Sequence, residues 1–90
     1  MNDLIEFLKI SGLSEFKELY EYVIKEFKNN SCVDIDLDYN TIILNNVMLY
    51  NVSNICIEFF CNDLLISFYN KNNELCNIDY NNIIDIDIMF

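Results

Sequence analysis

Residues 33–38 read Val33-Asp34-Ile35-Asp36-Leu37-Asp38, a strict alternation of apolar residues and aspartates. A period of two is typical of a β-strand with one buried face, because successive side chains point to opposite sides of a sheet. We expect the apolar side chains to face a core and the aspartates to face outward, about 6.6 Å apart along the strand. The stretch therefore predicts a half-buried strand, and the neighbouring segments decide what it packs against.

Short strand segments separated by asparagine-rich turns follow this stretch. We expect strands at residues 41–44, 47–50, 55–61, 64–69, 75–79 and 83–89, with two-residue turns at Asn45-Asn46 and Asn62-Asp63 and a longer loop at 70–73. Asparagine adopts the left-handed backbone conformation of tight hairpin turns more readily than most residues. Because such short connections join antiparallel neighbours, the segments predict a meander of about five to seven short strands.

The segment at 83–89 repeats the alternation of the first strand. Ile84, Ile86 and Ile88 are expected to face the core, whereas Asp85 and Asp87 are expected to face outward. Two strands of the same sheet would then carry an aspartate at every outward position.

The sequence before the first strand has the period of a helix. An apolar stripe recurs at helical spacing between residues 14 and 28, and consists of Phe16, Leu19, Tyr20, Val23, Ile24 and Phe27. Ser14 is the expected N-cap of this helix, and residues 3–10 predict a shorter helix that ends at Ser11-Gly12. We expect the stripe to cover one face of the sheet.

Helices followed by an antiparallel sheet predict an α+β fold, and the whole chain, residues 1–90, is expected to form one domain. One arrangement is an open, twisted sheet with the helices on one face, which the continuity of the helical stripe favours. The other is a small, bent, barrel-like sheet preceded by a helix, which topologically resembles the Sm-like and SH3-like barrels. Their RNA-binding function is not carried over, because those surfaces are basic and this chain is acidic.

The net charge of −10 arises from fifteen acidic residues and only five lysines. The fifteen asparagines, the absence of Ala, Arg and Pro and the single glycine are typical of a genome with AT-rich codons. That bias also favours lysine, so it does not explain why lysine is scarce. From residue 31 to residue 90 the chain holds nine acidic residues and a single cation, Lys71. The acidity is therefore concentrated in the predicted sheet.

The sequence lacks the parts of an enzyme active site. Without histidine it has no imidazole base or ligand, and a single glycine leaves no glycine-rich phosphate loop. No serine or cysteine stands in a nucleophile motif. The four cysteines, Cys32, Cys56, Cys61 and Cys76, lack the paired spacing of a zinc site. We expect free thiols, no cofactor and no catalysis.

The spacing of Asp34, Asp36 and Asp38 resembles the beginning of an EF-hand calcium loop. Tyr39 stands where that loop needs glycine for its sharp turn, and Asn45 stands where it needs a bidentate glutamate. We interpret the aspartates as part of a strand. A weak surface site for Ca²⁺ or Mg²⁺ is the alternative.

Outward aspartates without nearby cations repel one another, and a basic partner would relieve that repulsion. We therefore predict a partner-binding surface formed by Asp34, Asp36, Asp38, Glu58, Asp63, Asp85 and Asp87. The alternative is that these charges only keep the protein soluble and block edge-to-edge aggregation of the sheet.

A short, acidic, single-domain chain of AT-rich composition resembles the small phage-encoded anti-defence proteins, among them anti-CRISPR proteins. The resemblance covers size and charge and includes no sequence motif. It implies an inhibitor that mimics the charge of nucleic acid and binds a basic nucleic-acid-binding protein, such as a CRISPR effector, in the cytoplasm of a bacterial host. The acidic chain is not expected to bind DNA or RNA directly.

An alternative is a structural or assembly module that forms a homodimer through sheet edges or exposed aromatic residues, such as Tyr50, Phe60 and Tyr69. No apolar run approaches the roughly 18–20 residues that a membrane-spanning helix needs, and the N-terminus is acidic where a signal peptide is basic. We therefore expect neither a membrane partner nor export.

Overall fold

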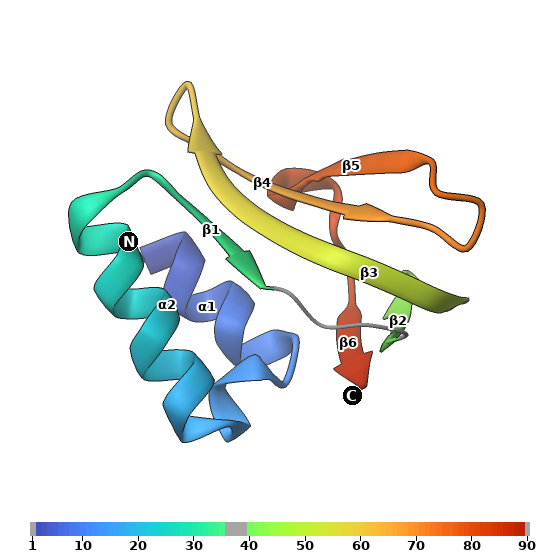
Figure 1. Ribbon diagram of the computed structural model, residues 1–90, viewed down its shortest axis with the longest axis horizontal. Coiled ribbons are helices and arrows are strands. Elements are labelled where there is room, and N and C mark those ends of the chain that lie inside the picture. Colours follow the sequence, from blue (N-terminus) through green and yellow to red (C-terminus); the bar gives the residue numbers. More distant parts are fainter. Residues whose placement is uncertain (1, 36–39, 90) are drawn as a thin grey trace.

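The computed structural model describes residues 2–35 and 40–89, so Asp36 and Asp38 lie outside the described residues. In these described ranges two helices precede six strands, which confirms the α+β class (Figure 1). The elements in chain order are α1 (Asn2–Ile10), η1 (Leu13–Glu15), α2 (Lys17–Asn29), β1 (Cys32–Ile35), β2 (Asn40–Leu44), β3 (Val47–Phe60), β4 (Asp63–Tyr69), β5 (Leu75–Asp79), η2 (Tyr80–Asn82) and β6 (Ile86–Met89).

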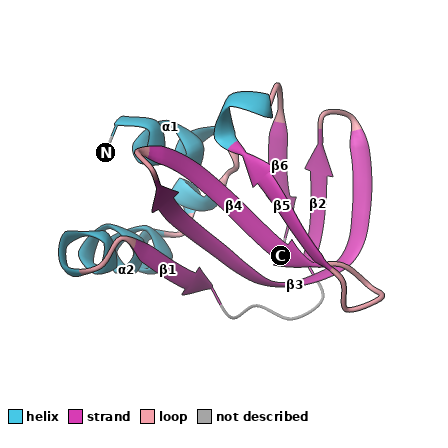
Figure 2. Ribbon diagram, turned by 90° about the horizontal axis from the view of Figure 1, so that it is seen from above, coloured by secondary structure: helices cyan, strands magenta, loops and turns pink. Residues whose placement is uncertain are grey.

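All strand pairs are antiparallel, in the order β5-β4-β3-β2-β6, and β1 pairs with β3. The last strand therefore returns to β2 instead of continuing a simple meander. β3 is shared by two parts of the sheet, because its first half pairs with β2 and its second half pairs with β1 and β4. Figure 2 shows the curvature of this long strand.

The curvature of β3 has a local cause. The sequence predicted separate strands at 47–50 and 55–61, whereas a single strand spans Val47–Phe60. Asn51 and Asn54 have positive φ angles of 55° and 52°, and the registers with β2 and β4 shift nearby. Such irregularities bend a strand without ending it. The fold thus combines helices packed on one face of a sheet, as in the first expected arrangement, with a bent sheet, as in the second.

Both helices pack on the inner face of the sheet. Leu4, Phe7 and Leu8 of α1 and Val23 of α2 are fully buried in the core. The remaining residues of the α2 stripe are partly buried against that core, except Phe16, which is 47% exposed. The N-cap prediction was wrong: α2 starts at Lys17, and Ser14 belongs to the short turn η1.

Each two-residue hairpin turn consists of two residues with positive φ angles. Asn45 and Asn46 have φ angles of 50° and 68° and connect β2 to β3, as predicted. The second turn is displaced by one residue from the prediction. Cys61 and Asn62 have the positive φ angles of 53° and 69°, and Asp63 is already paired with Phe60 as the first residue of β4.

The last strand is shorter than predicted. Ile86 and Ile88 are buried and Asp85 and Asp87 are exposed, as expected. The prediction for Ile84 was wrong, because Ile84 is 89% exposed and precedes β6. The side chain of Asn45 accounts for the difference: its Oδ1 accepts hydrogen bonds from the backbone N–H groups of Ile84 at 2.8 Å and Asp85 at 3.1 Å.

Candidate functional site

The register of β1, β3, β4 and β5 decides which side chains share a face. Val33, Ile57, Ile66 and Ile78 lie opposite one another across the four strands, and the first three are buried in the core. Directly paired residues lie on the same side of a sheet, and their neighbours along each strand lie on the other side. The residues flanking this row therefore form the outer face, away from the core.

Three rows of the outer face carry carboxylates. The rows, read across paired strands, are Phe60–Asp63, Cys32–Glu58–Leu65–Asp79 and Asp34–Cys56–Ser67–Asn77. We call the four carboxylates Asp34, Glu58, Asp63 and Asp79 the acidic face. Diagonal neighbours in a sheet, such as Glu58 and Asp34 or Glu58 and Asp63, lie about 7–8 Å apart.

The acidic face has no cation among its own strands. The chain has no arginine; four of its five lysines lie in the helices and the fifth, Lys71, lies in the loop between β4 and β5. Two carboxylates about 7 Å apart repel by roughly 0.6–2.4 kcal/mol at effective dielectric constants between 80 and 20. A cationic group placed over this face would relieve that repulsion.

Asp79 is not among the residues predicted for the partner-binding surface. This residue ends β5, and its carboxylate accepts a hydrogen bond from the backbone N–H of Asn81 at 3.0 Å, which caps η2. The alternation in 75–79 provided a usable signal, because an inward Ile78 places Asp79 outward. Its role as a cap gives the Asp79 carboxylate a structural function in addition to its charge.

Cys56 lies within the acidic face, between Asp34 on β1 and Ser67 on β4. Burial of the thiol, together with a hydrogen bond to Asp34 and the charge of its carboxylate, raises the pKa of Cys56 to about 11. A thiol with this pKa is protonated at neutral pH and is a poor nucleophile. The row of Asp34, Cys56 and Ser67 is therefore a hydrogen-bonded surface and lacks an activated thiolate.

The structure separates Asp85 and Asp87 from the acidic face. Asp87 lies on β6 opposite Ile43 of β2, in the other part of the sheet, and Met48 is the partner of Ile43 on β3. Asp87 is also close to the turn after α1, since a Cβ at Gly12 would lie 3.4 Å from its Oδ1. Of the predicted surface residues, the structure thus groups Asp34, Glu58 and Asp63.

The aromatic residues predicted to be exposed are exposed. Tyr50, Phe60 and Tyr69 have exposed fractions of 60%, 65% and 38%. Phe60 pairs with Asp63 and Tyr69 pairs with Leu75, so these two rings border the acidic face at opposite ends. Tyr50 lies in the first half of β3, beyond the irregularity near Asn51 and Asn54.

Within residues 2–35 and 40–89, no three Cys, Asp or Glu side chains come together as a metal site would require. No helix in the described part of the chain is long and apolar enough to span a membrane. No family model matches the sequence, and neither the curated proteins nor the solved structures include a match.

Proposed function

We propose that this protein is a binding protein that inhibits a basic nucleic-acid-binding protein, such as a CRISPR effector, by presenting carboxylates in place of phosphates. The observation that carries the proposal is the grouping of Asp34, Glu58 and Asp63 on one face of three paired strands that contain no lysine or arginine. Surfaces that hold a phosphate backbone present arginine and lysine side chains, which also pair with carboxylates.

A sheet suits this role because its backbone hydrogen bonds hold the carboxylates at set distances before binding. Preorganised groups lose little conformational freedom when a partner binds. A hydrogen bond to a charged group contributes about 1.5–3 kcal/mol. Three such pairs would therefore supply several kcal/mol, and the attraction would weaken with added salt because it is Coulombic.

A homodimer is the second candidate, and the exposed rings of Phe60 and Tyr69 favour it. In the described residues β5 is an edge strand of the sheet, so its unpaired edge is a second surface through which two copies could associate. Two copies with a charge of −10 each repel one another, which opposes association through the acidic face. Light scattering coupled to size-exclusion chromatography distinguishes a monomer of 10.7 kDa from a dimer.

The inhibitor proposal is tested with purified, guide-loaded CRISPR effectors and other basic nucleases. Binding of each enzyme to labelled target DNA is measured by mobility shift, with increasing amounts of the protein. We expect the protein to inhibit at least one enzyme. Raising the NaCl concentration from about 50 to about 300 mM should weaken this inhibition, because the contact consists of several charge pairs. Lack of inhibition across the panel at low salt would count against the proposal.

Two triple variants separate a specific face from net charge. The acidic-face variant combines Asp34→Asn, Glu58→Gln and Asp63→Asn, which removes three of the four charges of the acidic face and keeps the capping carboxylate of Asp79. The control variant combines Glu15→Gln, Glu18→Gln and Glu21→Gln, which removes the same charge from exposed positions around η1 and α2. The first variant should raise the inhibitory concentration by about 100-fold or more, and the second by less than about fivefold. Equal effects would show that only net charge matters.

A further inference from the structure

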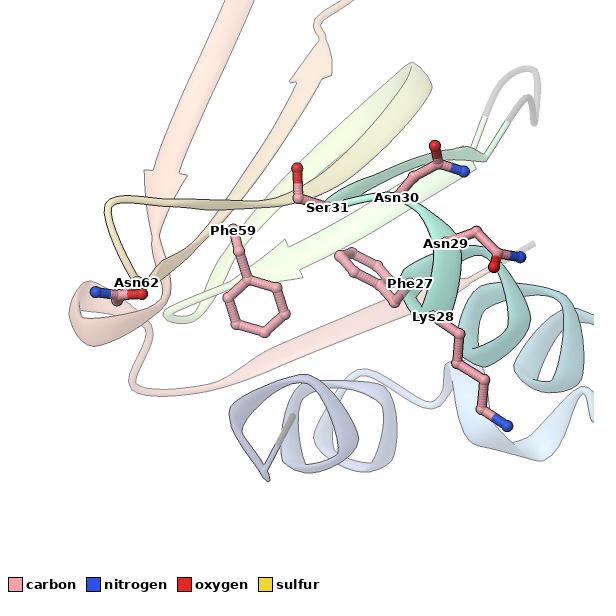
Figure 3. Close-up of a pocket in the computed structure, with 7 residues that line it drawn as sticks. All are labelled: Phe27, Lys28, Asn29, Asn30, Ser31, Phe59 and Asn62. Atoms are coloured by element: carbon pink, nitrogen blue, oxygen red, sulfur yellow. The ribbon is translucent and has the colours of Figure 1, made fainter.

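A pocket of about 530 Å³ lies where the end of α2 approaches the turn between β3 and β4. Its apolar part consists of Phe27 and Phe59, whose rings meet edge to face with 5.5 Å between their centroids and 82° between their planes. Figure 3 shows both rings beside the hollow, with one contributed by the helix and one by the sheet. Both side chains are partly buried against the core, and each leaves part of its surface exposed.

The polar part of the pocket includes three carboxamides, each of which carries an acceptor oxygen beside its NH2 group. The last turn of α2 and the residue after it supply Asn29 and Asn30, and Asn62 stands opposite in the hairpin turn. The final four carbonyl groups of a helix have no partner within it, and the helix dipole adds about half a negative charge at that end. The wall therefore offers carboxamide and backbone oxygens in a negative local potential.

The charges around the pocket also favour a cation. Lys28 is the one charged lining residue in the described chain, and Figure 3 shows its side chain directed away from both rings. One carboxylate borders the lining, because Glu26 Oε2 accepts a hydrogen bond from Asn30 Nδ2 at 3.3 Å. This carboxylate, the helix end and the net charge of −10 outweigh the single lysine.

We propose that this pocket binds the guanidinium group of an arginine side chain. A guanidinium is a planar cation that stacks on aromatic rings and donates five N–H groups, which matches an aromatic pair beside oxygen acceptors. A lysine ammonium is compact and strongly hydrated, so it gains less from the rings. The basic partner is the expected source of this arginine, and that assignment rests on the proposed function. The preference of the pocket for guanidinium is independent of the proposed function.

The probe is N-acetyl-arginine amide, titrated into the ¹⁵N-labelled full chain and followed by backbone amide shifts. We expect saturable shifts for residues 28–31, 59 and 62, with millimolar affinity. N-acetyl-lysine amide should bind at least about fivefold more weakly, on the scale of cation–π contacts. The citrulline analogue has nearly the same shape without the charge and should show no saturation.

Three variants test the parts of the pocket. Phe59→Leu keeps an apolar side chain and removes the ring, so affinity for the arginine probe should fall about fivefold. Lys28→Gln removes a like charge at an exposed position and should strengthen binding about twofold. Tyr50→Leu, a control at an exposed ring outside the pocket, should leave the affinity unchanged.

Two results would overturn the inference: saturation by citrulline as tight as by arginine, or weaker arginine binding in Lys28→Gln. The surface position of Lys28 keeps the second test valid even where Phe59→Leu perturbs folding. Shifts centred on Asp34 and Glu58 instead of the pocket would also refute it, while leaving the proposed acidic contact intact. Retained pocket binding in the acidic-face variant, together with lost inhibition, would support both proposals as separate contacts.

Discussion

Asn45 connects the turn between β2 and β3 to the segment that precedes β6. Its Oδ1 accepts the backbone N–H groups of Ile84 and Asp85, and its Nδ2 donates to the carbonyl of Asn82 at 3.2 Å. Its own N–H donates to the carbonyl of Asp85 at 2.8 Å. Asn45 also has a positive φ of 50°. We predict that Asn45→Ala is among the most destabilising substitutions at a site outside the core.

The expected magnitude follows from two contributions. Loss of three exposed side-chain hydrogen bonds removes roughly 1–3 kcal/mol, at the lower end of the range for such bonds. Alanine at a positive φ adds about 1 kcal/mol of backbone strain that asparagine tolerates better. The sum is a loss of about 2–4 kcal/mol in the free energy of unfolding, or roughly 10–25 °C in Tm for a domain of this size.

Urea denaturation followed by circular dichroism measures this loss. Two glycine variants separate the contribution of the side-chain hydrogen bonds from that of the backbone strain. Asn45→Gly removes the side-chain bonds and tolerates the positive φ, so it should lose about 1.5–3 kcal/mol. Asn46→Gly changes the neighbouring residue, whose φ is 68°, and should lose less than about 1 kcal/mol. In Asn45→Gly the amide protons of Ile84 and Asp85 should also exchange faster with solvent. The reasoning fails if both glycine variants unfold at the same urea concentration with equal m-values.

Two further predictions concern Cys56 and β6. Because the pKa of Cys56 is raised to about 11 by burial and Asp34, alkylation at pH 8 should modify the exposed Cys32 and Cys61 well before Cys56. Mass mapping of the modified cysteines checks this order, and Asp34→Asn should accelerate labelling of Cys56; equal rates for Cys56 and Cys61 would contradict the assignment. The unfolded thiol ionises near pH 9 and the folded one near 11, so this group's contribution to stability should be lost as the pH rises through that interval. In β6, Ile86→Ala should cost about 2–5 kcal/mol, whereas Ile84→Ala should change stability by less than about 0.5 kcal/mol; comparable losses in urea denaturation would show that Ile84 is packed.

The features predicted correctly from the sequence are those that a short segment determines within itself. The alternation around Val33 and Ile35 identified the buried and exposed sides of β1 in its described part. Asn45-Asn46 identified a hairpin turn, since asparagine accepts a positive φ at small cost. The apolar stripe of α2 identified the face that meets the sheet. In each case the signal lies in the periodicity or the backbone preference of neighbouring residues.

The error at Ile84 arose because a distant residue competes for the same backbone groups. The pattern 83–89 alone extends β6 through Ile84, but the side chain of Asn45, about forty residues earlier, takes the N–H groups of Ile84 and Asp85. Register places Phe60 opposite Asp63 and moves the second turn to Cys61-Asn62. Local periodicity carries no information about a partner such as Asn45, because only the pairing of β6 with β2 brings it to Ile84.

The same distinction applies to the candidate sites. Composition established an acidic sheet without arginine and with few lysines, and alternation established that Asp34 faces outward. Only the pairing of β1, β3 and β4 placed Asp34, Glu58 and Asp63 on one face, and only the return of β6 to β2 separated Asp85 and Asp87 from them. Likewise, Phe27 and Phe59 meet because the end of a helix packs against a hairpin thirty-two residues later. Charge and periodicity are properties of the amino-acid sequence itself. A shared surface depends on the pairing of strands that are distant in the sequence, and that pairing is determined by the packing of the folded core.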